Sequence, residues 1–452
     1  MKIILPIIYT IIFWIIIRNH RFFKIDGIRN EAMRLVFLLK IVSGFALLFM
    51  YTYYYTDRST SDIYKYFDDG VVMYKALFHN PLDYIKMLFG VLNDNEYFTY
   101  TYYNQMSHWF RSFESNIFSD SHAIIRFNAF VMLFSFGHIG VHVVFMVFLS
   151  FVGLTALYRF FLNYAKKSKI GLFVAVFLLP SVLFWGSGLL KEGLIFFSLG
   201  LLLYEFNKIS KRFNLFSLFW IVFSCLLLIH TKIFIVLIVT PLLISLLYSE
   251  IMDKRKVKYL FVTVVAVFFI LGFFTFYNIA GLNLFSMIVQ KQNDFVQLAL
   301  QESASSLLHE RFLELSFFSF TYELLIGFFN VAFRPLIFID NSIVYLPNIL
   351  ENMVIICLMI GVIFFRVNLN RFELSLVHFC FWFVMGIYVI TGITVPILGA
   401  IVRYKVIAMP FLFAIMMILI DKRKVFEKIP FLKKYYDYLS HKISYKSIMK
   451  KD

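Results

Sequence analysis

The chain has 452 residues, of which 61% are hydrophobic and only 15% are charged. Soluble globular domains carry about 25% charged and about 45–50% apolar residues, so this composition excludes an ordinary soluble enzyme and indicates a polytopic membrane protein. The formal net charge of +16 does not indicate a nucleic-acid partner, because the basic residues gather between apolar runs. Their expected partner is the lipid bilayer.

A helix needs about 20 apolar residues to cross a bilayer core, and about 17 are tolerated. The sequence therefore predicts an all-α, polytopic integral membrane bundle over residues 1–420, with about eleven transmembrane helices. We expect residues 1–17 to be an uncleaved first span, because no small-residue cleavage site follows them. The predicted spans lie near residues 1–17, 34–55, 139–163, 170–186, 189–206, 214–229, 232–249, 259–280, 345–365, 373–392 and 401–420.

Lysine and arginine mark alternate connections between the spans, and connections of this kind face the cytoplasm. The basic tail, residues 421–452, has ten Lys and Arg against four Asp and Glu, so it should be cytoplasmic and touch anionic lipid headgroups. Two long segments, 56–122 and 281–344, are then outer loops. The expected location is the bacterial cytoplasmic (inner) membrane. The other basic connections are 18–29, 159–169, 208–212, 254–258 and 366–371.

Two apolar stretches do not fit as full crossings. Residues 123–137 are short, and residues 316–333 begin and end on the same side if the neighbouring spans are placed correctly. We predict that both are interfacial or re-entrant helices, which are tolerated where they line a protein cavity.

Aspartates cluster at the start of the first outer loop. From Asp62 onward apolar residues recur at helical spacing, which predicts an amphipathic helix in the membrane interface. Asp62 and Asp69 share one flank of this helix, and Asp57 precedes it. A carboxylate there can take a proton from an acceptor hydroxyl, or hold a divalent cation, Mg²⁺ or Mn²⁺, that bridges a phosphate. The alternative is that these are ordinary solvated acids on a surface helix.

Ionisable residues also interrupt apolar sequence where spans are expected to reach the outer side. Such a residue costs a few kcal/mol unless it is paired or hydrated, so each is a functional-site candidate. Several cations on one side suit an anion, and phosphate or pyrophosphate is the anion expected at a lipid boundary. The alternative is snorkelling or a local ion pair, such as Lys191 with Glu192. The candidates are Lys191, Glu192, His230, Lys232, Arg334, Arg403 and Tyr404.

The remaining sequence signals are weaker. Aromatic residues crowd 97–103 and position 109; they could stack on sugar rings, but anchoring at the membrane interface is the favoured explanation. The three cysteines lie within apolar runs, so no disulfide or metal framework is expected. No Walker loop, zinc-protease motif, nucleophile elbow or dinucleotide fingerprint is present.

Three motifs together resemble the GT-C superfamily of membrane glycosyltransferases, which includes the protein O-mannosyltransferases. The first is an acidic outer loop that leads into an amphipathic helix, Ser61-Asp-Ile-Tyr-Lys-Tyr-Phe-Asp-Asp-Gly70. The second is an outer turn, Pro180-Ser-Val-Leu-Phe-Trp-Gly-Ser-Gly-Leu-Leu-Lys-Glu192. The third opens a late span, Arg403-Tyr-Lys-Val-Ile-Ala-Met-Pro410.

The resemblance implies a GT-C-like fold and an inverting sugar transfer on the extracytoplasmic face. The donor would be a polyprenyl-phosphate-linked sugar, and the acceptor a glycan or a lipid-linked acceptor used in cell-envelope glycan assembly. By position Asp62 is the best match to the family's loop aspartate, which acts as general base, and Asp57 is the second. The basic residues would hold the phosphate.

Two alternatives stay open. The polytopic O-antigen and exopolysaccharide polymerases or ligases also combine outer acids, outer arginines and lipid-linked oligosaccharides. A transporter for a lipid-linked anion is the third hypothesis. It predicts ionisable residues in the middle of spans and two related halves of the sequence. It ranks lowest because the ionisable groups are expected at span ends and no halves repeat.

Overall fold

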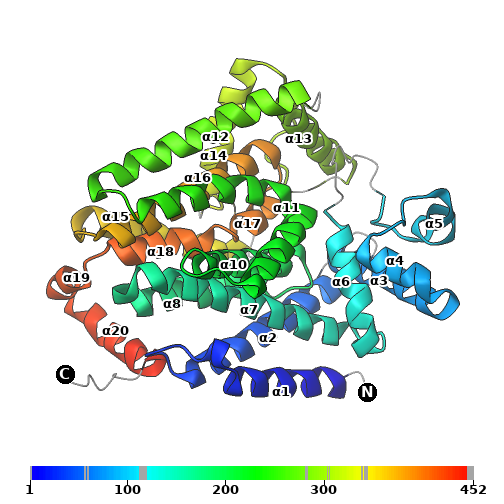
Figure 1. Ribbon diagram of the computed structural model, residues 1–452, viewed down its shortest axis with the longest axis horizontal. Helices are drawn as coiled ribbons and strands as arrows, with labels where there is room; N and C mark the ends of the chain where they lie inside the picture. Colours follow the sequence, from blue (N-terminus) through cyan, green and yellow to red (C-terminus); the bar gives the residue numbers. More distant parts are fainter. Residues whose placement is uncertain are drawn as a thin grey trace.

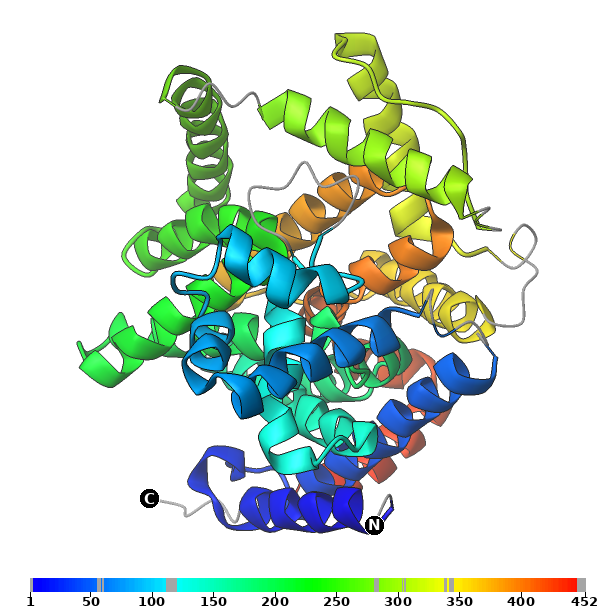
Figure 2. The ribbon, with the colours of Figure 1, turned by 90° about the vertical axis from the view of Figure 1, so that its right-hand side faces the viewer.

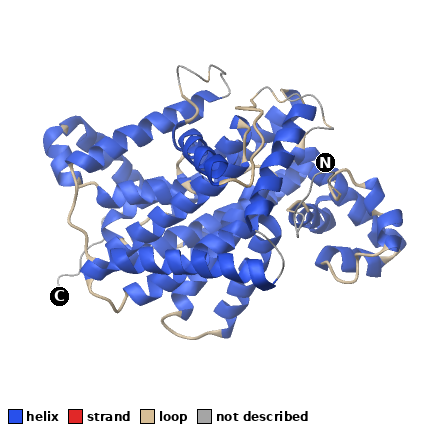
Figure 3. Cartoon of the chain, turned by 90° about the horizontal axis from the view of Figure 1, so that it is seen from above, coloured by secondary structure: helices blue, strands red, loops and turns tan. Residues whose placement is uncertain are grey.

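The computed structural model describes residues 3–54, 58, 61–110, 120–279, 284–302, 304, 306–336, 340 and 345–444. Every named element within these residues is a helix, and no strand is found there (Figure 3). The all-α prediction is therefore confirmed for the described chain. Asp57, one of the predicted catalytic candidates, lies outside these residues.

The first ten α-helices bring the chain from the N-terminus through the 56–122 segment and back into the bundle (Figure 1). They are α1 Ile4–Asn19, α2 Asn30–Tyr53, α3 Asp62–His79, α4 Pro81–Phe89, α5 Glu96–Thr101, α6 His122–Ser135, α7 Ile139–Tyr164, α8 Lys169–Phe177, α9 Pro180–Trp185 and α10 Lys191–Ile209.

The second ten complete the bundle and the tail. They are α11 Leu215–Ser249, α12 Val257–Ile279, α13 Leu284–Gln301, α14 Phe317–Phe333, α15 Leu346–Phe364, α16 Arg371–Thr394, α17 Leu398–Lys405, α18 Met409–Leu419, α19 Lys422–Lys428 and α20 Pro430–Ile443.

Five helices of the described chain are long and apolar enough to cross a membrane, namely α2, α7, α11, α15 and α16. The pair α17 and α18, bent by 56°, would make a sixth. This supports an integral membrane bundle but does not confirm eleven crossings. In particular, the predicted span 170–186 is two short helices, α8 and α9, because Pro180 starts a new helix in its middle.

Helix α11 covers two predicted spans, 214–229 and 232–249. Its backbone leaves the helical region at Lys232 (φ −153°, ψ 84°). Both ends of α11 lie against the C-terminal part of α10. At the first end, Ser217 donates to Glu205 of α10. At the other end, Glu250 accepts from Tyr164, which in turn accepts from Asn207 of α10. The helix therefore folds back at Lys232. Each arm is about 25 Å long at about 1.5 Å per residue, near the lower limit for a crossing.

The basic connections meet at one end of the bundle, which we call the α20 end. Arg159 donates to the Phe22 carbonyl, and Arg371 donates to that of Met252. The amide of Arg29 donates to the carbonyl of Ile443, the last residue of α20. Helices α3 to α6 lie at the opposite end, the α3 end, which faces the viewer in Figure 2. The sequence thus sorted these connections to one end correctly.

Glycine allows the closest helix contact in the bundle core. A Cβ atom on Gly200 of α10 would collide with the backbone carbonyl of Gly153 on α7, and the reverse substitution would strike the backbone at Phe196. The close approach of α7 and α10 places the first turn of α10 against the α3 end. Small residues commonly permit such backbone contact between membrane helices.

We expect Gly200→Val to lower the thermal stability of the detergent-purified protein, because overpacking a tight core costs about 1–3 kcal/mol. The matched control is Gly361→Val on α15, where a Cβ would lie an ordinary 3.7 Å from Ile420. Equal melting temperatures for the two variants would contradict the close approach of α7 and α10.

Candidate active site

Arg403 joins three helices at the α3 end. Its Nη1 donates to Asp62 Oδ2 and its Nε donates to Glu192 Oε1, both at 2.8 Å. The side chains are 12% exposed for Arg403, 32% for Asp62 and 1% for Glu192. Asp62 of the 56–122 segment therefore meets the guanidinium of the last long apolar segment, across 341 residues of sequence.

The helix ends explain why these charges are stable together. Asp62 is the first residue of α3 and Glu192 lies in the first turn of α10, while Arg403 lies in the last turn of α17. Carboxylates favour the positive end of the helix dipole and cations favour its negative end. The local sequence at each helix terminus therefore supports the long-range ion pairs.

A further carboxylate, that of Asp120, bridges Lys191 and Lys232 beside Arg403. Asp120 Oδ1 lies 2.6 Å from Lys191 Nζ, and Asp120 Oδ2 lies 3.5 Å from Lys232 Nζ. Lys232 reaches this position because α11 folds back there, and its ammonium also lies 4.0 Å from the ring centroid of Tyr404. We call Asp62, Asp120, Lys191, Glu192, Lys232 and Arg403 the ionic cluster.

Asp69 has a different place from the one the sequence suggested. It is 2% exposed, and its two oxygens accept the backbone N–H groups of Ser107 and His108, both at 2.8 Å. This holds the loop that brings His108 Nε2 to 3.7 Å from Asp62 Oδ1. Asp69 is therefore a positioning residue of the His108 loop, with both oxygens engaged by amides.

The two aspartates also differ in electrostatics. Burial raises the pKa of Asp62, but the nearby imidazole of His108 and the charge of Arg403 outweigh it and hold this pKa well below its usual range. Burial raises the pKa of Asp69, while the amides of Ser107 and His108 act in the opposite direction. Asp62 is accordingly ionised and, while it contacts Arg403, a weak base.

We expect Asp69→Ala to expose the loop containing Ser107 and His108 to proteases, because two N–H groups lose their acceptor at about 1–3 kcal/mol each. Limited proteolysis of the 103–110 segment measures this. Asp68→Ala is the control, since Asp68 is 47% exposed and pairs only with Arg58 among the described contacts. Digestion at the same rate in both variants would refute the anchoring role.

Three predicted residues lie at or beyond the edge of the ionic cluster. Tyr404 touches it only through the Lys232 ammonium. The carbonyl of Arg334 accepts from Lys405 at 2.8 Å, and within the described chain its guanidinium forms no ion pair. His230 lies near α6, where burial and the charges of Arg126 and His230 lower the pKa of His122 to about 4. No described contact joins the guanidinium of Arg334 to the ionic cluster, so its place in a phosphate clamp stays a prediction.

Sequence reasoning missed two residues. Asp120 had no signal beyond its place just before α6. Lys40 is fully buried in the middle of α2, and its ammonium donates to the carbonyl of Gly186 at 3.0 Å. It joins α2 to the α9–α10 turn and so positions Lys191 and Glu192. A lysine inside an apolar run was a visible signal for such a role.

The aromatic stretch is mainly a scaffold. Tyr103 is 1% exposed and stacks on Trp109 at 4.2 Å, and Trp109 stacks in turn on His122 at 3.7 Å. Tyr97 and Tyr102 both donate to Asp83. The ring faces of Tyr103 and Trp109 are therefore occupied by neighbours. Tyr97 and Tyr100 remain more than half exposed.

The cluster is closed on itself. Each of its cations contacts a carboxylate, and within the described part of the chain the buried Oε2 of Glu192 has no hydrogen-bond partner. Among the described residues no group of three or more His, Cys, Asp or Glu side chains is arranged to hold a metal ion. One cavity of about 310 Å³ lies nearby, between Arg58 and His138, and another of about 170 Å³ lies at the α20 end. An anion that bound Nε or Nη1 of Arg403 would displace a carboxylate.

No protein-family model, curated protein or solved structure matches this chain. The functional assignment therefore depends on the geometry of the ionic cluster and on the residues that resemble the GT-C superfamily.

Proposed function

We propose that this protein is a membrane glycosyltransferase that moves a sugar from a polyprenyl-phosphate-linked donor to a glycan or lipid-linked acceptor. The observation that carries the proposal is the pairing of Arg403 with Asp62 and Glu192, beside Lys191 and Lys232, at one end of a membrane bundle. Sugar transfer from a lipid phosphate needs a base for the acceptor and cations for the leaving phosphate, and the cluster contains both.

In the proposed reaction the acceptor hydroxyl oxygen attacks the anomeric carbon of the sugar. The bond from that carbon to the phosphate oxygen breaks with inversion, the hydroxyl proton moves to Asp62, and the phosphate leaves with its lipid. Arg403 and the two lysines stabilise the charge of the departing phosphate. When Arg403 turns from Asp62 to the phosphate, the pKa of Asp62 rises toward its ordinary value and the carboxylate becomes a better base.

The proposed topology follows from the basic connections. Their gathering at the α20 end supports a cytoplasmic position for that end, and an outward-facing ionic cluster in the bacterial cytoplasmic membrane. The count of eleven crossings is reached if α1, α8 with α9, α10, each arm of α11 and α12 cross in addition to α2, α7, α15, α16 and the α17–α18 pair.

Transfer can be measured with the protein in nanodiscs as release of polyprenyl phosphate from a lipid-linked sugar. We expect Lys191→Gln to lower the rate about tenfold or more, because it removes one charged contact to the phosphate. Lys208→Gln is a matched control at the other end of α10, where Lys208 pairs with Glu205. Equal rates for the two variants, or no transfer by the wild type with any lipid-linked donor, would refute the proposal.

Glycan analysis of a deletion strain identifies the kind of transfer. Loss of a single sugar from the envelope glycan fits the proposed transferase. Loss of long chains with single repeat units remaining would favour a polymerase or ligase instead. Unused lipid-linked sugar confined to the inner leaflet would favour a transporter.

A further inference from the structure

Helices α19 and α20 form an amphipathic pair at the α20 end. Residues 421–444 hold seven Lys and Arg against three Asp and Glu. In α20, Tyr436 and Ile443 face the bundle, whereas Phe431, Tyr435 and Tyr438 are 54–65% exposed on the other part of the apolar face. A helix with an uncovered apolar face and basic flanks is typical of a helix that lies in a membrane interface.

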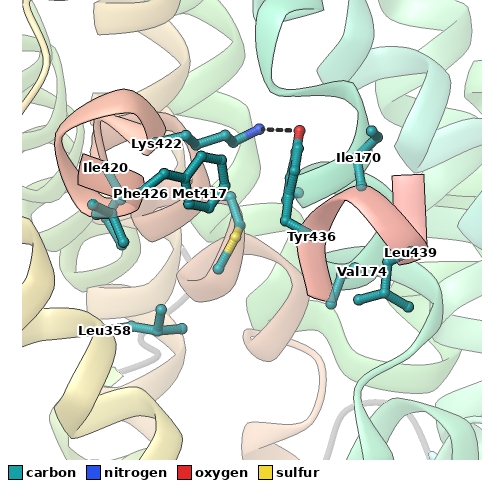
Figure 4. A pocket seen from close by; sticks show the side chains of 11 residues that line it. Ile170, Val174, Leu358, Met417, Ile420, Lys422, Phe426, Tyr436 and Leu439 are labelled. Atoms are coloured by element: carbon teal, nitrogen blue, oxygen red, sulfur yellow. Dashed lines mark hydrogen bonds between the residues drawn. The ribbon is translucent and has the colours of Figure 1, made fainter. Parts of the chain in front are cut away.

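An apolar cavity lies between this pair and the bundle. It has a volume of about 170 Å³ and receives side chains from α8, α15, α18, α19 and α20 (Figure 4). Ile170, Val174, Leu358, Met417 and Leu439 supply apolar walls. A cavity of about 150 Å³ with such walls takes a benzene-sized molecule, so this one has room for a short segment of hydrocarbon chain.

One lining residue of the cavity, Lys422, is a cation that has no ion-pair partner among the described residues. Lys422 Nζ donates to the neutral hydroxyl of Tyr436 at 3.3 Å, and Figure 4 shows the two side chains meeting at the rim. Within the described chain Lys422 forms no ion pair. Burial lowers the pKa of its ammonium, so a phosphate at this position would be favourable.

We infer that the cavity beneath α20 is a binding site for one anionic phospholipid, with part of an acyl chain among Val174, Leu358 and Leu439 and the headgroup phosphate on Lys422. Phe431, Tyr435 and Tyr438 then lie in the surrounding lipid interface. The charge of the α19–α20 pair favours an anionic lipid over a zwitterionic one. The inference is independent of sugar transfer, because the site is at the end opposite to the ionic cluster.

Native mass spectrometry of the full chain, with added phosphatidylglycerol or phosphatidylcholine, tests the site. We expect phosphatidylglycerol to bind preferentially, and Lys422→Gln to weaken that binding about tenfold, since one charge-assisted contact is lost. Lys428→Gln is the matched control, because Lys428 is an exposed lysine on the same helix that does not line the cavity. Leu439→Trp, which fills the cavity from the exposed helix, should also weaken binding.

Three outcomes would overturn the inference. The first is equal binding of the two phospholipids by the wild type. The second is equal loss in Lys422→Gln and Lys428→Gln, which would indicate a diffuse surface charge effect. The third is tight binding of polyprenyl phosphate that phosphatidylglycerol does not displace, which would assign the cavity to a different lipid.

Discussion

Replacing Arg403 with methionine should lower sugar transfer by a factor on the order of 10²–10³ or more and reduce the free energy of unfolding by about 3–5 kcal/mol. The stability loss arises because Glu192 is 1% exposed and would keep its charge without a partner. In the proposed reaction the rate falls because the leaving phosphate loses the N–H donors of Arg403. Transfer assays and thermal unfolding in detergent measure the two effects.

A double variant separates the structural and the chemical roles of Arg403. Arg403→Met with Glu192→Gln removes the unpaired charge, so we expect it to recover part of the lost stability but none of the activity. Arg403→Lys keeps the charge but offers one nitrogen in place of the two, Nε and Nη1, that contact Glu192 and Asp62 here. A double variant that regains activity would show that Arg403 is only structural.

Asp62→Asn is expected to lower transfer about 10²–10⁴-fold, because the amide cannot accept the proton of the acceptor hydroxyl. Binding of the lipid-linked donor should persist, since Arg403 keeps its contact with Glu192. Asp68→Asn serves as the control on the same helix, outside the ionic cluster. If donor binding and transfer fell together in Asp62→Asn, the residue would be a binding group and not the base.

The ion pair of Asp62 with Arg403 should make the stability of the folded protein depend on pH. Its pKa in the folded protein lies below the value of about 3.9 for an unfolded chain. The stabilising contribution is therefore fully present above about pH 4 and is lost as the pH falls through the lower, folded pKa. Thermal unfolding of the wild type and of Asp62→Asn should differ most near neutral pH and converge in acid. A difference that grows in acid would contradict the ion pair with Arg403.

Much of this architecture could be predicted from the sequence, because the signals for it lie within short stretches of the chain. Apolar runs and basic connections located the bundle and its two ends, and the 3.6-residue pattern after Asp62 located α3. The ionic candidates Asp62, Glu192, Lys191, Lys232 and Arg403 were each visible as charges at expected span ends. That Arg403 also pairs with Glu192, and that Asp120 joins the two lysines, was not visible, because these pairs depend on how separate helix termini meet in space.

Other features could not be inferred from one sequence. Asp120 bridges two lysines from a position with no distinguishing neighbours, and the anchoring role of Asp69 depends on where the 107–108 loop returns. Residues 170–186 are almost entirely apolar, so hydropathy alone did not reveal the break before α9, whose local signal is Pro180. Arg334 looked equivalent to Arg403 in sequence, yet its described hydrogen bonds are made by its backbone N–H and carbonyl groups, and not by its guanidinium.

The turn of α11 at Lys232 makes the ionic cluster sensitive to helical phase. One residue inserted between Ser217 and Lys232 would rotate the lysine by about 100° around the first arm and shift it by about 1.5 Å, away from Asp120. Such an insertion would leave hydropathy, length class and charge almost unchanged. Homologous chains can therefore match this one in every membrane-topology profile and still lack the Lys232 ammonium in the ionic cluster. Only the number of residues between Ser217 and Lys232 would distinguish them.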